Sequence, residues 1–370
     1  MTNYNVVCPC LLGAEGLVAE ELRAMNLNGV SAENGRVSFT GDMQMIARAN
    51  LNSRYSERIL IELGNFYADS FEALFEGTKA LPWADIIGRN NAFPVKGRSV
   101  GSKLTSIPDC QAIIKKAIVE KLKLSYKTDW FKETDSIIQV QFLIMKNKVS
   151  LMIDTSGAGL HKRGYRKTST EAPIKETLAA MMVKLARVRD DATFYDPFCG
   201  SGTILIEAAT YAHNIAPGLK RHFAAERWSD TSFWETERAR AKDLIKRNAT
   251  FQAYGSDIDQ EAVDLSLANI KKAGVSNKIE VEKRDIIDFQ RNTQYGCVIC
   301  NPPYGERLLD LHSARDLYKT MGQVFQPQKG WGYTIISPDE EFEKIFGKTA
   351  DRRRKLYNGM LKCQVFMYYK

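Results

Sequence analysis

The chain has 370 residues and a mass of 41.8 kDa, enough for about two or three domains that each bury a core. Hydrophobic residues make up 44% and charged residues 26% of the sequence, and these fractions exclude a disordered chain, a collagen-like repeat and a coiled coil. No apolar run is long enough to span a membrane, and the first ten residues lack the positive start of a secretory signal. We therefore expect a soluble cytoplasmic protein with no membrane partner.

The cysteines and histidines give no sign of a disulfide framework or a metal site. The seven cysteines are an odd number without the spacing of paired thiols, which fits a reducing compartment. Cys297 and Cys300 form a single CxxC, but this pair falls in an apolar run that we expect to be a strand. No two of the four histidines are four residues apart. The sequence therefore predicts no metal cofactor.

The net charge of +8 arises mainly in the middle of the chain. Residues 96–170 carry 15 basic and 6 acidic side chains, whereas residues 1–95 carry 7 and 11. Such a local excess attracts phosphates, and two basic loops with interleaved glycine and tyrosine favour contact with nucleic acid. The predicted contact residues are Lys96, Arg98, Lys103, Lys162, Arg163, Arg166 and Lys167. A solvated surface is the alternative, and it is our preferred explanation for the lysine-rich helix at 115–123; the basic cluster at 352–355 fits either.

Two small α/β units are predicted before residue 155. The first has a strand at 5–10, a helix at 15–25 and strand character at 30–39 with a tight turn at Asn34-Gly35. The second begins around 52–68 and continues with a helix at 71–80, a strand at 93–100, a helix at 109–122 and strands at 136–144 and 148–154. Small and flexible residues at 155–159 are the expected linker.

From residue 173 the pattern alternates between helix and strand, which predicts βαβ crossovers and a parallel, doubly wound sheet. The expected helices are 173–189, 203–213, 260–273 and 314–325, and the expected strands are 192–195, 253–256, 278–282, 296–300 and 332–337. An inserted helical segment is expected from about 214 to 248. Residues 356–369 form an expected antiparallel hairpin, which is unlike the nicotinamide-binding arrangement.

A glycine loop, DPFCGSGT, starts at Asp196, follows one predicted strand and begins a helix. Gly200 and Gly202 permit a tight turn and close approach of a ligand, and the Asp196 carboxylate can bind a cationic amino group. The third glycine of the dinucleotide fingerprint is replaced by Leu205, which argues against NAD and FAD. A purely structural strand-to-helix turn is the alternative.

Acidic residues end the next two strands. Asp257 lies where a carboxylate can chelate both ribose hydroxyls of a nucleoside cofactor, and Asp285 lies where an adenine amino group could donate to it. Asp259 is expected to cap the following helix. Either Asp257 or Asp285 alone would also fit a surface or capping residue, but the series on successive strand ends indicates a nucleoside site.

The tetrapeptide Asn301-Pro302-Pro303-Tyr304 follows an apolar strand at the same predicted sheet edge. A conjugated exocyclic amine is a poor nucleophile because its lone pair is delocalised into the ring. The Asn301 side-chain oxygen and the Pro302 carbonyl can accept its two N–H bonds and turn the lone pair toward a methyl sulfonium. Pro303 helps to hold that carbonyl outward, and Tyr304 is expected to stack on the base. A proline-rich turn is the alternative.

These motifs support a resemblance. DPFCGSGT, GSDID and NPPYGER, preceded by HKRGYR and APIKETLAA, resemble the guanine-N2 RNA methyltransferases with an N-terminal THUMP domain, especially the first half of the bifunctional large-subunit ribosomal RNA methyltransferase of bacteria. The resemblance implies a ferredoxin-like domain at 1–60, a THUMP RNA-binding domain at 61–156 and a Rossmann-like methyltransferase domain at 157–370 with a mixed seven-stranded sheet. No second methyltransferase half is present, so a second reaction is not expected.

The resemblance also implies a cofactor, a substrate and site residues. The cofactor is S-adenosylmethionine, and the partner is structured RNA, with ribosomal RNA as the first expectation and transfer RNA as the second. The residues implied in cofactor binding are Asp196, Phe198, Gly200, Gly202, Thr203, Asp257 and Asp285. The residues implied in holding the target base are 301–304.

Other functions share parts of this pattern. Adenine-N6 methyltransferases of nucleic acids and the glutamine-N5 methyltransferase of release factors also use Asn-Pro-Pro-Tyr, because each must align an amide or amine nitrogen. The basic, THUMP-like region argues against both. A non-catalytic RNA-binding assembly factor is opposed by the intact loop, carboxylates and tetrapeptide. The sequence leaves the target nucleotide and the oligomeric state open.

Overall fold

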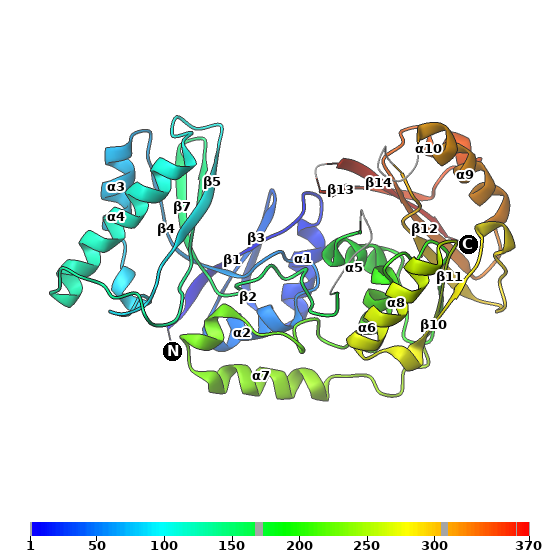
Figure 1. The fold of residues 1–370 in the computed structure, drawn as a ribbon, viewed down its shortest axis with the longest axis horizontal. Coiled ribbons are helices and arrows are strands. Elements are labelled where there is room, and N and C mark those ends of the chain that lie inside the picture. The colour runs from blue at the N-terminus through cyan, green and yellow to red at the C-terminus, as the bar shows by residue number, and fades with distance from the viewer. Residues whose placement is uncertain (1, 167–172, 305–309, 360, 370) are drawn as a thin grey trace.

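The computed structural model describes residues 2–166, 173–304, 310–359 and 361–369, and Figure 1 shows their arrangement. Two seven-stranded sheets dominate the molecule, one in the N-terminal part and one in the C-terminal part. The predicted α/β class is therefore confirmed. Within the described ranges, no helix combines the length and the apolar character needed to cross a bilayer.

The N-terminal sheet joins the first two predicted units into one continuous sheet with the order β2-β3-β1-β4-β7-β6-β5. Its strands are β1 (Tyr4–Pro9), β2 (Asn28–Glu33), β3 (Arg36–Gly41), β4 (Leu60–Tyr67), β5 (Val95–Val100), β6 (Val140–Met145) and β7 (Lys148–Asp154). Strand β1 pairs with β4, so Val6 lies opposite Ile61, and Ile61 lies opposite Ile153 of β7. The expected domain boundary at residue 60 therefore falls inside a strand.

Four helices pack on this sheet: α1 (Glu15–Ala24), α2 (Met43–Asn52), α3 (Phe71–Lys79) and α4 (Ile107–Tyr126). The helix α2 is absent from the sequence prediction. Its N-cap is Asp42, whose side chain accepts from the Met45 amide, but its buried positions include Ala47, Ala49 and Asn50. Small and polar residues on the buried face weaken the helical periodicity of hydrophobic side chains, so the pattern does not reveal it.

The expected linker at 155–159 is wrong in one respect, because its first residues are packed. Thr155 and Ser156 are fully buried. The Asp154 carboxylate accepts hydrogen bonds from the amides of Ser156 and Gly157 at 2.9 and 3.1 Å. Composition predicted flexibility here, whereas hydrogen bonding to neighbouring segments fixes the backbone.

The C-terminal sheet has the order β10-β9-β8-β11-β12-β14-β13. Its strands are β8 (Thr193–Asp196), β9 (Gln252–Asp257), β10 (Ile279–Lys283), β11 (Gly296–Cys300), β12 (Trp331–Ser337), β13 (Arg352–Asn358) and β14 (Leu361–Tyr369). The first five in this order are parallel, and the predicted hairpin adds β14 and β13 antiparallel. The order reverses between β8 and β11, which places a ligand crevice at their carboxyl ends.

The helices of this part are α5 (Glu176–Leu185), α6 (Thr203–Ala212), α7 (Thr231–Asp243), α8 (Gln260–Ala273), α9 (Leu311–Val324) and the unpredicted α10 (Phe342–Phe346). The expected insertion contains α7, which lies along α2 of the N-terminal part (Figure 1). Glu237 of α7 accepts hydrogen bonds from Arg48 and Gln44. This insertion ties the two parts together.

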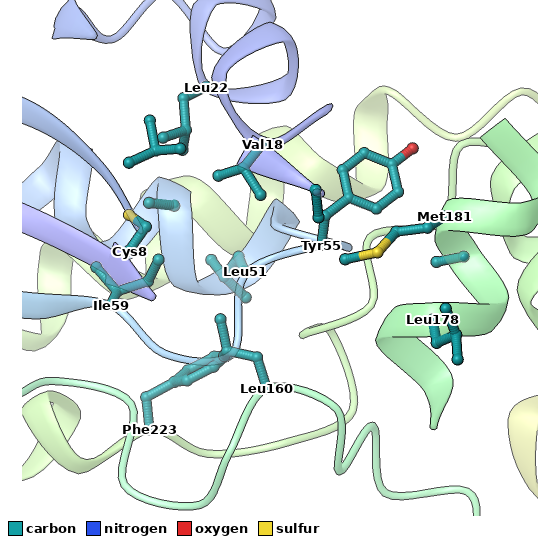
Figure 2. Packing of buried hydrophobic residues seen from close by; sticks show 14 of the residues in the cluster. Cys8, Val18, Leu22, Leu51, Tyr55, Ile59, Leu160, Leu178, Met181 and Phe223 are labelled. Atoms are coloured by element: carbon teal, nitrogen blue, oxygen red, sulfur yellow. The ribbon is translucent and has the colours of Figure 1, made fainter. Parts of the chain in front are cut away.

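A shared apolar core also joins the two parts. Figure 2 shows Val18 and Tyr55 of the N-terminal part near Met181 of α5, and all three belong to one buried cluster. Because both parts contribute to this core, the N-terminal sheet is packed against the C-terminal part.

Candidate active site

A cavity of about 940 Å³ opens at the carboxyl ends of β8, β9, β10 and β11. It brings together residues of the glycine loop, the acidic series and the tetrapeptide, which are spread over residues 196–303 of the chain. The predicted site residues that line it are Asp196, Phe198, Gly200, Thr203, Asp257, Asp285, Asn301 and Pro303. The main expectation from the sequence, that the glycine loop and Asn301 share one sheet edge, is confirmed.

Asp196 provides a buried acceptor at the floor of the cavity. Its carboxylate is 1% exposed, and Oδ1 accepts from the Phe198 amide at 3.2 Å. Oδ2 has no hydrogen-bond partner among the described residues. Burial, with a smaller contribution from the nearby Asp257 carboxylate, raises the pKa of Asp196 well above its ordinary value. A cationic amino group at this point would satisfy the free oxygen and remove the cost of the buried charge.

Asp257 holds the glycine loop in place. Its Oδ2 accepts from the Gly200 amide at 2.9 Å, and its Oδ1 accepts from the Asp259 amide at 3.1 Å. Gly200 has φ +50°, and the position of an added Cβ has no atom within 4 Å. The backbone is therefore open to a ligand there. Asp259 accepts from the Glu261 amide and caps α8, as predicted.

Gly202 is not among the described residues that line the cavity, and its surroundings show a role in packing. It begins α6 with φ +76°, and a Cβ added here would lie 2.4 Å from Oγ of Ser266 on α8. Any larger side chain would push α6 and α8 apart. The sequence shows the glycine but does not show which neighbour demands it.

Two isoleucines that the sequence analysis did not single out also line the cavity. Ile258 and Ile287 are 65% and 68% exposed, unusual values for large apolar side chains. Ile258 directly follows Asp257 and Ile287 lies two residues after Asp285, and this closeness to the acidic residues is the signal that could have identified them. Asp285 itself caps a short 3-10 helix through the Ile287 amide. Exposed apolar side chains beside hydrogen-bonding carboxylates suit a flat heterocycle.

The tetrapeptide divides between the cavity and the terminal hairpin. Asn301 contributes a buried Oδ1 with no hydrogen-bond partner among the described residues. Pro303 lines the cavity, whereas Pro302 and Tyr304 are not among its described lining residues. The Tyr304 hydroxyl accepts from Asn358 at 2.9 Å, and burial raises the pKa of Tyr304. The expectation that Tyr304 stacks on a base is therefore not met by its position in this structure.

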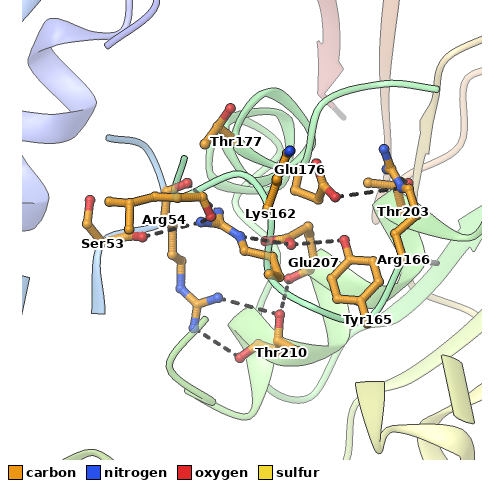
Figure 3. Close-up of polar contacts among 12 residues, drawn as sticks. Ser53, Arg54, Lys162, Tyr165, Arg166, Glu176, Thr177, Thr203, Glu207 and Thr210 are labelled. Carbon is orange, nitrogen blue, oxygen red and sulfur yellow. Dashed lines mark hydrogen bonds and ion pairs between the residues drawn. The ribbon is translucent and has the colours of Figure 1, made fainter. Parts of the chain in front are cut away.

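The loop that contains Arg163 is structural and not a free basic surface. Arg163 is 4% exposed, lies 3.4 Å from Glu207 and donates to the Arg54 carbonyl at 2.6 Å. Tyr165 donates to the same glutamate at 3.2 Å, within the network drawn in Figure 3. The prediction that Arg163 contacts RNA is wrong, because its guanidinium is buried and bound to protein groups.

The other predicted RNA contacts differ in accessibility. Arg166 is half-buried and donates to the Ile174 carbonyl, so it too acts internally. Lys162 is exposed, as are Lys96 and Arg98, which share one face of β5. Lys103 is exposed but forms a 2.7 Å ion pair with Asp69. Lys167 lies outside the described residues. The accessible cations are thus a subset of those predicted.

Comparison with known families identifies the chain. A family model described as the RMKL-like methyltransferase domain matches residues 163–366, and models of the RlmL ferredoxin-like domain and the THUMP domain match residues 5–60 and 68–154. The chain belongs to the THUMP-containing, RlmL-like methyltransferases. It combines a ferredoxin-like domain and a THUMP RNA-binding domain with a methyltransferase domain, which confirms the resemblance seen in the motifs.

Two curated relatives bear on this RlmL-like chain. It is 41% identical to the Bacillus subtilis (strain 168) protein named "Putative RNA methyltransferase YpsC", over all of this chain and 97% of that protein. It is 34% identical to the ribosomal RNA large subunit methyltransferase K/L of Cellvibrio japonicus, over 99% of this chain and 51% of that protein. The chain thus spans about half the length of the K/L relatives.

Solved structures agree with the fold and identify the cofactor. The crystal structure of SMU.472 complexed with SAH is 40% identical, with a TM-score of 0.95 over all of this chain and 98% of that chain. A Listeria monocytogenes structure described as a "predicted N6-adenine-specific DNA methylase" is 42% identical, with a TM-score of 0.94 over all of this chain and 97% of that chain. The cofactor of this RlmL-like protein is S-adenosylmethionine, whose demethylated product is SAH.

Proposed function

We propose that the protein transfers the methyl group of S-adenosylmethionine to the exocyclic N2 amine of a guanosine in large-subunit ribosomal RNA. The observation that carries this proposal is the unpartnered Oδ1 of Asn301, which lies on the same cavity as Asp196 and the Gly200 turn. An acceptor left free in a protein interior costs free energy, and an incoming N–H donor removes that cost. The names of the K/L relatives support the ribosomal substrate.

Residue roles follow from the contacts. Asp196 would hold the amino group of the cofactor, Asp257 its ribose hydroxyls and Asp285 its adenine amine, beside the apolar faces of Ile258 and Ile287. These residues bind and orient, and the cofactor supplies the electrophilic methyl group. Asn301 Oδ1 and the Pro302 carbonyl would accept the two N–H bonds of the target amine and aim its lone pair. The base has to leave its stack to reach them.

We also propose the bounds of the three domains: ferredoxin-like at 1–60, THUMP at 61–156 and methyltransferase at 157–370.

The exposed side chains of Lys96, Arg98 and Lys162 are the proposed phosphate contacts. Transfer RNA is the second substrate class. Adenine N6 is the second target atom, because the tetrapeptide suits either amine and the Listeria monocytogenes relative bears an N6-adenine description.

The test compares Asn301→Ala with wild type on ribosomal and transfer RNA from cells that lack the gene. We expect methyl transfer to fall by about 100-fold or more, as when one transition-state hydrogen bond is lost, while cofactor affinity stays unchanged in calorimetry. Asn277→Ala, on the short helix Ser276–Lys278, is the matched control. Mass spectrometry of nucleosides should give N2-methylguanosine. N6-methyladenosine would select the alternative, and full activity of Asn301→Ala would contradict the assigned role.

A further inference from the structure

A second cavity, of about 650 Å³, lies between the N-terminal part and the terminal hairpin. Its walls are Leu17 of α1, Tyr211 of α6, four residues at and just after the end of α5, and parts of β13 and β14. The four residues are Lys184, Leu185, Arg187 and Val188. We call it the hairpin groove. It is separate from the cofactor cavity, since no residue lines both.

The two cavities carry opposite charge. The described residues that line the cofactor cavity include six carboxylates and one cation, Arg284. The described lining of the hairpin groove includes five cations and no carboxylate: Lys184, Arg187, Arg352, Arg353 and Arg354. Phosphates are repelled by the first cavity and attracted by the second. An RNA whose base enters the acidic cavity therefore needs its backbone held elsewhere.

Three of the five cations remain available for a ligand. The other two are already paired with carboxylates, Lys184 with Glu20 and Arg353 with Glu343, both at 2.7 Å. Arg187 and Arg352 form no ion pair with any described carboxylate. Arg354 donates to the Gly13 carbonyl, which leaves its positive charge uncompensated.

Arg187 has the geometry of a prepared phosphate ligand. Its guanidinium lies over the ring of Tyr369, 5.2 Å from the centroid, and the Tyr369 hydroxyl is fixed by a 2.9 Å bond to the Leu185 carbonyl. The stacking contact fixes the plane of the guanidinium. The N–H groups at the edge of that plane stay free to bind a phosphate through two hydrogen bonds. Arg187 has φ +57° because it ends α5 in a left-handed turn, in which the Val188 amide donates to the Val183 carbonyl, and this turn fixes the backbone from which the guanidinium extends.

The hairpin links this groove to the target-base site. Strand β13 starts at Arg352 and ends at Asn358, which bonds Tyr304 of the tetrapeptide. Six steps of a strand span roughly 20 Å. The groove and the tetrapeptide are therefore two ends of one rigid element.

We propose that the hairpin groove binds the phosphodiester backbone of the RNA substrate, roughly 20 Å from the flipped base. This inference rests on the proposed function in naming RNA as the substrate. Arg187, Arg352 and Arg354 supply the charge, and Tyr369 positions Arg187.

The first test measures binding of a fluorescein-labelled 20-nucleotide oligouridylate at several salt concentrations. For the double variant Arg187→Gln/Arg352→Gln we expect weaker binding and a log Kd against log salt slope smaller by about 1.4, at roughly 0.7 per lost contact to a single strand. Lys271→Gln/Lys272→Gln, exposed on α8 and remote from the groove lining, is the charge-matched control and should behave as wild type. An unchanged slope in the groove variant, or an equal change in the control, would overturn the proposal.

A second measurement uses wild-type protein and so does not depend on a variant that folds. Cross-linking of the same oligonucleotide carrying 4-thiouridine should label peptides that contain residues 184–188 or 352–358, and labelling confined to other peptides would overturn the proposal. Failure of the proposed function can be distinguished from failure of the groove proposal. A wild-type protein that methylates no RNA but shows the slope difference would refute guanine methylation and keep the groove, whereas active protein with unchanged slopes would refute only the groove.

Discussion

Nδ2 of Asn358 donates a hydrogen bond of 2.9 Å to the hydroxyl oxygen of Tyr304 across 54 residues of chain. The terminal hairpin thereby anchors the last residue of the tetrapeptide that carries Asn301. Tyr304 also packs against the buried core, so both its ring and its hydroxyl tie the end of the tetrapeptide to the hairpin.

The hydroxyl and the ring of Tyr304 are expected to matter differently. Tyr304→Phe removes one hydrogen bond and should lower the free energy of unfolding by about 1 kcal/mol with most activity retained. Asn358→Ala should match it. Tyr304→Ala removes the packed ring and should lower kcat strongly, with destabilisation of about 3 kcal/mol or more. Denaturant unfolding and steady-state methyl transfer measure both effects, and loss of activity in Tyr304→Phe alone would show that the hydroxyl takes part in the reaction.

Cofactor affinity should rise with pH because of Asp196. Its pKa is raised in the free protein, so part of the population is protonated and cannot pair with a cationic amino group until the proton leaves. Binding should therefore release a proton, and affinity should increase with pH up to the raised pKa. Titration calorimetry in buffers of different ionisation enthalpy checks this below about pH 7.5, where an α-amino group stays charged.

The same ionisation affects stability with a definite sign. A carboxyl whose folded pKa lies above its unfolded value stabilises the fold below the unfolded pKa, and this contribution is lost as pH rises through the folded pKa. Asp196→Asn should therefore unfold at a higher temperature than wild type at neutral pH, while it binds the cofactor weakly and without proton release. Equal pH profiles of affinity in both proteins would remove Asp196 from the amino-group site.

Variants of Arg163 should affect the stability of the fold, whereas variants of Lys96 and Arg98 should affect the salt dependence of RNA binding. Arg163→Ala leaves Glu207 buried without its guanidinium partner and should cost about 3 to 5 kcal/mol of stability with an unchanged salt slope of RNA binding. Lys96→Gln/Arg98→Gln should leave the melting temperature unchanged and reduce that slope by about 1.4. The reverse pattern would contradict the burial of Arg163 or the RNA contact of β5.

The two loop glycines should also respond differently to alanine. Both have positive φ, which costs about 1 kcal/mol or more for a residue with a Cβ. Gly202→Ala adds a contact with Ser266 and should lower the melting temperature more, with partial rescue by Ser266→Ala. Gly200→Ala meets open space and should mainly lower cofactor affinity. Equal losses of stability would argue against the close packing of α6 on α8.

The sequence predicted the strands and helices that form the active-site edge of the sheet better than it predicted which basic side chains are exposed. The bounds of α8, β7 and β11 match their predictions because caps and continuous apolar runs mark them. The helix α2 was missed because three of its five buried residues, Ala47, Ala49 and Asn50, are small or polar and weaken the apolar periodicity. In the HKRGYR loop, Arg163 and Tyr165 point inward, and a residue type alone does not show whether its charge faces water or Glu207.

The continuous sheet from β2 to β5 has a mechanical consequence. Backbone hydrogen bonds between β1 and β4 join the first two domains and restrict their relative rotation, and the α7 insertion holds them against the C-terminal part. If RNA contacts Lys96 and Arg98 on the outer strand β5, as proposed, the distance from that contact to the active-site cavity is fixed by the fold. We then expect an RNA stem lengthened by a few base pairs to carry the target base past the cavity.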